Sequence, residues 1–341
     1  MVDDVSKIPR VTKVETADGV SLGAFPNEEP RNKYGHNDSV STGSCPEDVW
    51  EGGGLYTGFN ATAAEELTLV SSSTHDVGSD KATGTITGGT GSSIVDAEGT
   101  FLGDATVGDC FVNVTQGTHG IIKTVENDSR LTVHLMHGDT PNRPPVNAIG
   151  DSYRIVQAAG NGAALVRLTN ILNANYEPQT PIYVTLNGTS EVTTSGASAM
   201  RCDEGAVVLA GSVGSNSGII GCTQAVSTAN VFFAMPAGKG HTQVCALTTP
   251  AGTLALLETV DIVSARSNGG LGSVTAELRT RKIGEAWQSE RVFELTTAVP
   301  VNKIFKYALQ VPEKTDVIVT TTAVSDNGTV VQAELDFKLI T

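Results

Sequence analysis

Residues 331–340 read Val-Gln-Ala-Glu-Leu-Asp-Phe-Lys-Leu-Ile, a regular alternation of apolar and polar side chains. Successive side chains of a β-strand point to opposite faces, so this pattern predicts a strand with one buried face and one wet face. Similar strand patterns, separated by turn residues, fill the chain from residue 240 onward. They lie at 242–247, 253–263, 273–281, 291–295, 304–309, 316–324 and 330–340. Seven antiparallel strands without a helical pattern predict a jelly-roll-like domain over residues 240–341.

The composition of the whole chain favours the same all-β fold class. Its 341 residues include 37 glycines, aromatic residues make up only 5%, and Thr, Ser and Val recur in short runs. β-Branched residues pack well on pleated sheets, and glycine supplies the backbone conformations of tight turns. A chain of this length can hold two or three domains, each with its own core.

A second β-sandwich domain is predicted from two separate segments, residues 59–81 and 159–239. Its strand candidates lie at 65–71, 163–169, 179–186, 207–210, 219–222 and 231–235. Asn187-Gly188 predicts a tight hairpin turn, because both residues tolerate a positive φ. Between the two segments, residues 82–158 show short strands punctuated by four Gly-Asp pairs. We interpret 82–158 as a small β-barrel or β-sandwich subdomain inserted at an exposed turn; one continuous irregular sandwich is the alternative.

The first 58 residues differ from the rest of the chain. They are polar, with one short strand candidate at Val11–Val14, and residues 31–58 show no periodic apolar face. This block nevertheless holds three large aromatic side chains, Tyr34, Trp50 and Tyr56. The pattern predicts an extended N-terminal arm over residues 1–58 that a neighbouring subunit orders, with these three aromatics as the interface contacts.

Charge and targeting features narrow the classes of partner. The formal net charge is −15, with no stripe of Lys and Arg, which argues against nucleic-acid binding. The N-terminus lacks the basic and apolar regions of a signal peptide, and no apolar run is long enough to span a membrane. We expect synthesis in a cytoplasm and no membrane partner. The five widely spaced cysteines are expected to be reduced and mostly buried.

No catalytic or cofactor-binding pattern is found in the sequence. The Gly-rich stretches lack a phosphate-binding signature, and the nucleophile-elbow and zinc-protease motifs are absent. His134 and His137 are three residues apart and would face opposite sides of a strand, which suits a metal pair poorly. Trp287 is isolated and is interpreted as a core or interface residue. The sequence therefore predicts a non-enzymatic protein with no cofactor and no metal.

Two motifs carry a resemblance to a known family. Arg31-Asn-Lys-Tyr-Gly-His-Asn-Asp-Ser-Val, followed by Pro46-Glu-Asp-Val-Trp-Glu-Gly-Gly-Gly-Leu-Tyr, resembles the N-terminal signature of a family of tailed-bacteriophage virion proteins. The segments flanking the insertion and the last hairpin, from Val311-Pro-Glu-Lys-Thr-Asp to Ile340, also resemble that family. Residues 82–158 fall outside the resemblance.

The resemblance implies a structural protein of a bacteriophage virion, most simply a capsid decoration or cement protein on the capsid surface, made in the cytoplasm of the bacterial host. Its expected partners are the major capsid protein and further copies of itself, with a trimer as one form of the homo-oligomer. The alternative is a tail-fibre or adhesin-type module that binds host-surface carbohydrate, which would need clustered exposed aromatics. A β-sandwich hydrolase is disfavoured by the missing catalytic residues.

Overall fold

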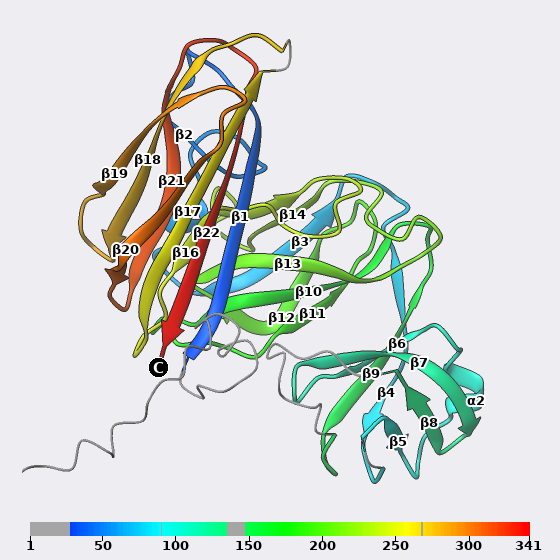
Figure 1. Ribbon diagram of the computed structural model, residues 1–341. Helices are drawn as coiled ribbons and strands as arrows, with labels where there is room; N and C mark the ends of the chain where they lie inside the picture. The colour runs from blue at the N-terminus through cyan, green and yellow to red at the C-terminus, as the bar shows by residue number, and fades with distance from the viewer. Residues whose placement is uncertain (1–27, 90, 135–146, 267–268) are drawn as a thin grey trace, which may run out of the picture.

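The computed structural model describes residues 28–89, 91–134, 147–266 and 269–341. Strands dominate it, and helix is confined among these residues to two single turns, η2 (Gly58–Asn60) and α2 (Phe101–Asp104). The strands form several antiparallel sheets, which confirms the predicted all-β fold. Three β units follow one another across the molecule, and each later unit is inserted within the chain of the one before it (Figure 1).

The first unit is a jelly roll of eight strands in two sheets. The strands are β1 (Glu28–Val40), β16 (Ala246–Thr248), β17 (Leu254–Arg266), β18 (Ser273–Lys282), β19 (Gln288–Thr296), β20 (Val301–Val311), β21 (Thr315–Val324) and β22 (Thr329–Ile340). One sheet has the order β1-β22-β17-β20 and the other has the order β16-β21-β18-β19. Numbered one to eight along the chain, these orders are 1-8-3-6 and 2-7-4-5, the arrangement of a jelly roll. The alternating apolar residues of the two inner faces form its core.

Strand β1 corrects the prediction of an N-terminal arm. It pairs with β22 along its length, from Glu28 opposite Ile340 to Val40 opposite Thr329, and the two strands run side by side in Figure 1. The short strand β2 (Glu47–Asp48) pairs with β21 of the second sheet. Residues 28–48 are therefore part of the jelly roll, which is not confined to residues 240–341 as predicted. Residues 1–27 of the predicted arm, including Val11–Val14, lie outside the described residues.

The inward-facing residues of β1 explain why its sequence does not look like a core strand. Lys33, Gly35 and Asn37 pair with buried apolar positions of β22, yet none of them is apolar. Gly35 is required by space, because a Cβ there would lie 2.3 Å from the Val49 carbonyl oxygen and 2.4 Å from the Cys245 nitrogen. The inner side of β1 faces another part of the chain at close range, so small and hydrogen-bonding residues replace the usual apolar ones.

The second unit is a sandwich inserted between the first two jelly-roll strands. Its strands are β3 (Glu65–Ser71), β10 (Ala163–Leu172), β11 (Ile182–Thr185), β12 (Val192–Ala199), β13 (Arg201–Ala210), β14 (Ile220–Gln224) and β15 (Val231–Met235). They form a sheet of order β11-β10-β13 and a sheet of order β12-β3-β14-β15. The core between them includes Leu67, Val166, Phe232 and Phe233, all fully buried.

The third unit lies between β3 and β10 and forms a small barrel at the end of the molecule away from the jelly roll (Figure 1). Its strands are β4 (Gly78–Thr85), β5 (Ser93–Val95), β6 (Cys110–Asn113), β7 (Thr118–Asn127), β8 (Arg130–Val133) and β9 (Ser152–Ala158), in the order β4-β9-β6-β7-β8-β5. The Thr87 N–H donates to the Val95 carbonyl at 2.8 Å, and the Val95 N–H donates to the Gly88 carbonyl at 2.9 Å. These bonds join the two ends of the sheet around a core that contains Phe101, Phe111 and Tyr153.

Buried ion pairs join the jelly roll to the second unit. Lys33 Nζ of β1 lies 3.1 Å from Asp203 Oδ1 of β13, and both side chains are buried. Asp316 Oδ2 of β21 lies 3.4 Å from Arg201 Nη2 of β13 and 2.7 Å from Arg281 Nη2 of β18. Charges this deeply buried are stable only when their partners stay in place, so the pairs fix the relative position of the two units.

Candidate functional site

Two of the three predicted interface aromatics are core residues of this chain. Trp50 and Tyr56 are 5% and 4% exposed, and their rings meet edge to face with centroids 5.4 Å apart. Tyr56 meets Phe59 in the same way at 4.9 Å, and its hydroxyl donates to the Phe232 carbonyl at 3.1 Å. These side chains pack together where the chain passes from the jelly roll into the second unit. The prediction that Trp50 and Tyr56 contact a neighbouring subunit is therefore corrected.

Tyr34 is the predicted interface residue that the fold leaves at the surface. It lies on β1 directly opposite Glu334 of β22 and is partly exposed. Partial burial raises the pKa of its hydroxyl, and the nearby carboxylates of Asp38 and Glu334 raise it further. Tyr34 stays neutral and able to donate a hydrogen bond to a partner, so its role as an interface contact stays a prediction.

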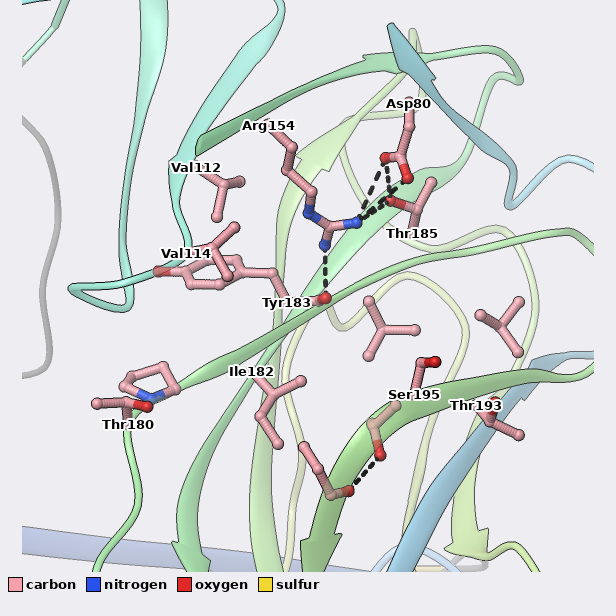
Figure 2. Close-up of a pocket in the computed structure, with 15 residues that line it drawn as sticks. Asp80, Val112, Val114, Arg154, Thr180, Ile182, Tyr183, Thr185, Thr193 and Ser195 are labelled. Atoms are coloured by element: carbon pink, nitrogen blue, oxygen red, sulfur yellow. Dashed lines mark hydrogen bonds and ion pairs between the residues drawn. The ribbon is translucent and has the colours of Figure 1, made fainter. Parts of the chain in front are cut away.

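A groove with a volume of about 520 Å³ lies between the barrel and the second unit, as Figure 2 shows. Strands β6 and β9 of the barrel form one wall, and β11 and β12 form the other. Both β11 and β12 are edge strands of their sheets among the described residues. The lining residues are Asp80, Val112, Val114, Arg154, Thr180–Thr185, Val192–Ser195 and Ala197. A groove of this size can accommodate a small ligand.

Arg154 crosses this groove and ties the barrel to the second unit. Its guanidinium donates to Thr185 Oγ1 at 3.0 Å and to the Tyr183 carbonyl at 2.5 Å, and it pairs with Asp80 Oδ1 at 3.3 Å (Figure 2). The Thr185 hydroxyl also donates to Asp80 Oδ1 at 2.7 Å. The guanidinium is thus engaged by the protein itself. Its role is to hold the two units together, and little of its hydrogen-bonding capacity is left for a ligand.

The other groove residues offer contacts to a ligand. Val112, Val114 and Ile182 provide apolar walls, and threonine and serine hydroxyls provide polar contacts. The Tyr183 hydroxyl donates to the Gly117 carbonyl at 3.1 Å and lies 3.0 Å from His119 Nδ1. The Thr185 hydroxyl donates to Asp80, and the Arg154 guanidinium pairs with the same carboxylate, so these polar groups are engaged with one another. The groove can therefore bind a ligand through shape and hydroxyl contacts.

Sequence reasoning did not find this groove. Its two charged residues, Asp80 and Arg154, are 74 positions apart and meet only because β4 pairs with β9. No motif links them, and each is an ordinary charged residue on a strand. The boundaries of the insertion were the available signal, because an inserted domain creates a junction where grooves form.

Within the described residues, no group of three or more His, Cys, Asp or Glu side chains is arranged to hold a metal ion. In the same ranges, no helix has the length and apolar character needed to cross a membrane. Comparison of the chain with protein-family models, with curated proteins and with solved structures finds no match. The function must therefore be inferred from the residues and their geometry.

Glu51 gives the protein a specific dependence on pH. Its carboxylate accepts hydrogen bonds from the N–H groups of Ala234 and Gln243, both at 3.0 Å, where the jelly roll meets the second unit. Burial raises the pKa of this carboxyl to about 7, although the two N–H donors oppose the shift. Below pH 4.5 the group is neutral in the folded and unfolded states, and burial costs no ionisation energy.

Between pH 4.5 and 7, the Glu51 carboxyl ionises in the unfolded chain but stays protonated in the folded chain. The free energy of unfolding therefore falls as the pH rises across this range. The loss should reach about 3 kcal/mol above pH 7, since each pKa unit corresponds to about 1.4 kcal/mol. We expect the difference in unfolding free energy between Glu51→Gln and the unchanged protein to shift by this amount between pH 4.5 and 8. Urea titrations across that range measure it, and a difference that is independent of pH would contradict the account.

Proposed function

We propose that this protein is a non-enzymatic structural component of a tailed-bacteriophage virion, a capsid decoration protein that binds and stabilises the head. The observation that carries the proposal is the jelly-roll order of the strands, 1-8-3-6 in one sheet and 2-7-4-5 in the other. Strand β1 of the first sheet contains residues 31–40, the first part of the N-terminal signature. Jelly rolls are recurrent in viral capsid proteins, although lectins and cupins share the architecture. The fold alone does not select among these functions. The resemblance of residues 31–56 to phage virion proteins favours a virion role.

The arrangement of the three units supports a structural role. Ion pairs and aromatic contacts hold the first two units together, and the Arg154 contacts hold the barrel to the second. A protein locked in this way presents fixed surfaces, which is what a component that reinforces a shell requires. The expected partners are the major capsid protein and further copies of this chain, on the outer surface of the head.

A carbohydrate-binding tail-fibre or adhesin role is the second candidate, and the groove in Figure 2 is the observation that favours it. Hydroxyl groups line the groove, and sugars are recognised through such contacts. Sugar-binding grooves also use exposed aromatic rings as stacking platforms. The Tyr183 ring is the aromatic side chain among the lining residues, and its hydroxyl is already bonded within the protein.

The experiment that separates the two roles adds the purified chain to phage heads from which it has been removed, to isolated tails, and to immobilised host-surface glycans. The capsid proposal predicts saturable binding to heads and a higher temperature of head disruption. Binding to tails or glycans without binding to heads would contradict it and support the second candidate. Thr193→Ala with Ser195→Ala, which removes two groove hydroxyls, should leave head binding unchanged.

A further inference from the structure

Strand β20 carries an exposed basic projection at the edge of its sheet. Leu309 pairs with Leu257 of β17 and Ile304 pairs with Thr259, so the four residues 305–308 face a single residue of β17. Three extra residues make β20 bulge outward at this point. Phe305 turns inward against the jelly-roll core, while the side chain of Tyr307 is 81% exposed and that of Ile304 is 69% exposed.

The projection has a charge opposite to that of the chain as a whole. Residues 295–312 contain two lysines, Lys303 and Lys306, and no Asp or Glu, within a chain of net charge −15. Both lysines are exposed. In the described parts of the chain neither lysine forms an ion pair, and Lys306 Nζ lies 5.5 Å from the centre of the Tyr307 ring. We call Lys303, Ile304, Lys306 and Tyr307 the basic knob.

The outer face of the same sheet holds a complementary hollow of about 250 Å³. Its lining residues are Tyr34, Asp261, Ile262, Val263, Pro300, Gln332, Ala333 and Glu334. We call it the acidic hollow, because Asp261 and Glu334 stand directly opposite each other on β17 and β22. Tyr34 and Pro300 add an aromatic ring and an apolar ring to its wall.

The two carboxylates of the acidic hollow lack a cationic partner among the described residues. Asn32 Nδ2 donates to Glu334 at 2.5 Å, and the amide of Asn302 donates to Asp261. These neutral donors satisfy oxygen atoms without neutralising charge. Like charges directly opposite each other on a sheet are destabilising, so a cation supplied from outside would relieve their repulsion.

We propose that the basic knob of one copy of this chain binds in the acidic hollow of the next copy. Lys303 and Lys306 then neutralise Asp261 and Glu334, and Tyr307 packs against Tyr34 and Pro300. The occupant is a second copy because one chain carries both halves, each with unpaired charge of opposite sign. The knob lies at an edge of the sheet and the hollow lies on its face, so the contact joins two different surfaces. Repeated contacts of this kind close into a ring of three or more copies.

This inference deepens the proposed function by naming the surface through which copies assemble, and its test requires no virus particle. The mass of the full chain is measured by light scattering during size-exclusion chromatography, at low and at high salt. The expected result is a closed oligomer of at least three copies that dissociates as salt screens the contact. A monomer at high micromolar concentration, or a dimer, would overturn the proposal.

Charge reversal tests the contact itself. Lys303→Glu with Lys306→Glu should weaken association about 100-fold, because like charges would then face each other. Asp261→Lys with Glu334→Lys should do the same. A mixture of the two double variants should associate again, through contacts between unlike chains. Tyr307→Ala should weaken association about 30-fold.

The matched control is Lys123→Glu with Lys239→Glu, the same double charge change at exposed positions of the barrel and the second unit, which should leave the mass unchanged. Unaltered assembly in both reversed variants, with their folding verified by circular dichroism, would overturn the assigned surface. Loss of head binding with assembly intact would count against the capsid proposal alone, so the two failures are distinguishable.

Discussion

Deletion of residues 1–58 is expected to abolish the folding of the jelly roll, while deletion of residues 1–27 should leave it folded. The longer deletion removes β1 and β2 and exposes the edge of β22 along its length. It also removes Trp50 and Tyr56 from the core of the second unit. An open sheet edge and two lost aromatic side chains together cost more than the net stability of most domains.

The two deletion variants are compared by thermal unfolding and by protection of backbone amides from hydrogen exchange. The shorter deletion keeps every contact that the described residues make with one another, so its β22 amides should be protected as in the full chain. The longer deletion should lose that protection. Cooperative unfolding with protected β22 amides in the longer variant would show that β1 is a removable arm, as first predicted from the sequence.

Asp316→Ala is the point substitution with the largest expected effect, a loss of about 3–5 kcal/mol in the free energy of unfolding. Asp316 has no exposed surface and pairs with Arg201 and Arg281. Arg201 is itself only 3% exposed, so the substitution leaves a buried guanidinium without its counterion. The Thr248 hydroxyl, which donates to Asp316 at 2.6 Å, also loses its acceptor.

Denaturant titration measures this loss, and Asp326→Ala provides the matched control. Asp326 pairs with Arg266 at 3.1 Å but is 39% exposed, and a pair at the surface contributes at most about 1 kcal/mol. The account predicts a clear difference between the two variants. Equal effects would mean that the buried pairs contribute little to the junction between the jelly roll and the second unit.

The parts of the fold predicted from sequence are those in which one strand face is apolar and the other polar. Residues 331–340 alternate because β22 lies in the middle of its sheet, with one face on the core and one in water. Strand β1 could not be recognised in the same way, because its inner side meets Asp203 and Cys245 and carries Lys33 and Gly35. A long interruption of the chain also separates β1 from the strands it joins.

The features at the junctions between units could not be predicted for a related reason. Lys33 and Asp203 are 170 positions apart, and Arg201 and Asp316 are 115 positions apart. A charged residue on a strand predicts a solvent-exposed face, and only the packing of two units shows that these charges are buried together. The same limit applies to Trp50 and Tyr56, whose burial depends on a sandwich built from later residues.

We propose that this jelly-roll protein is part of the surface of a phage head. Electron cryomicroscopy of intact particles tests it most directly, by locating density that fits the jelly roll, the second unit and the barrel. The account predicts such density on the outer surface of the capsid, in contact with the major capsid protein and with neighbouring copies of this chain. Density confined to the tail or its fibres, with none on the head, would contradict it.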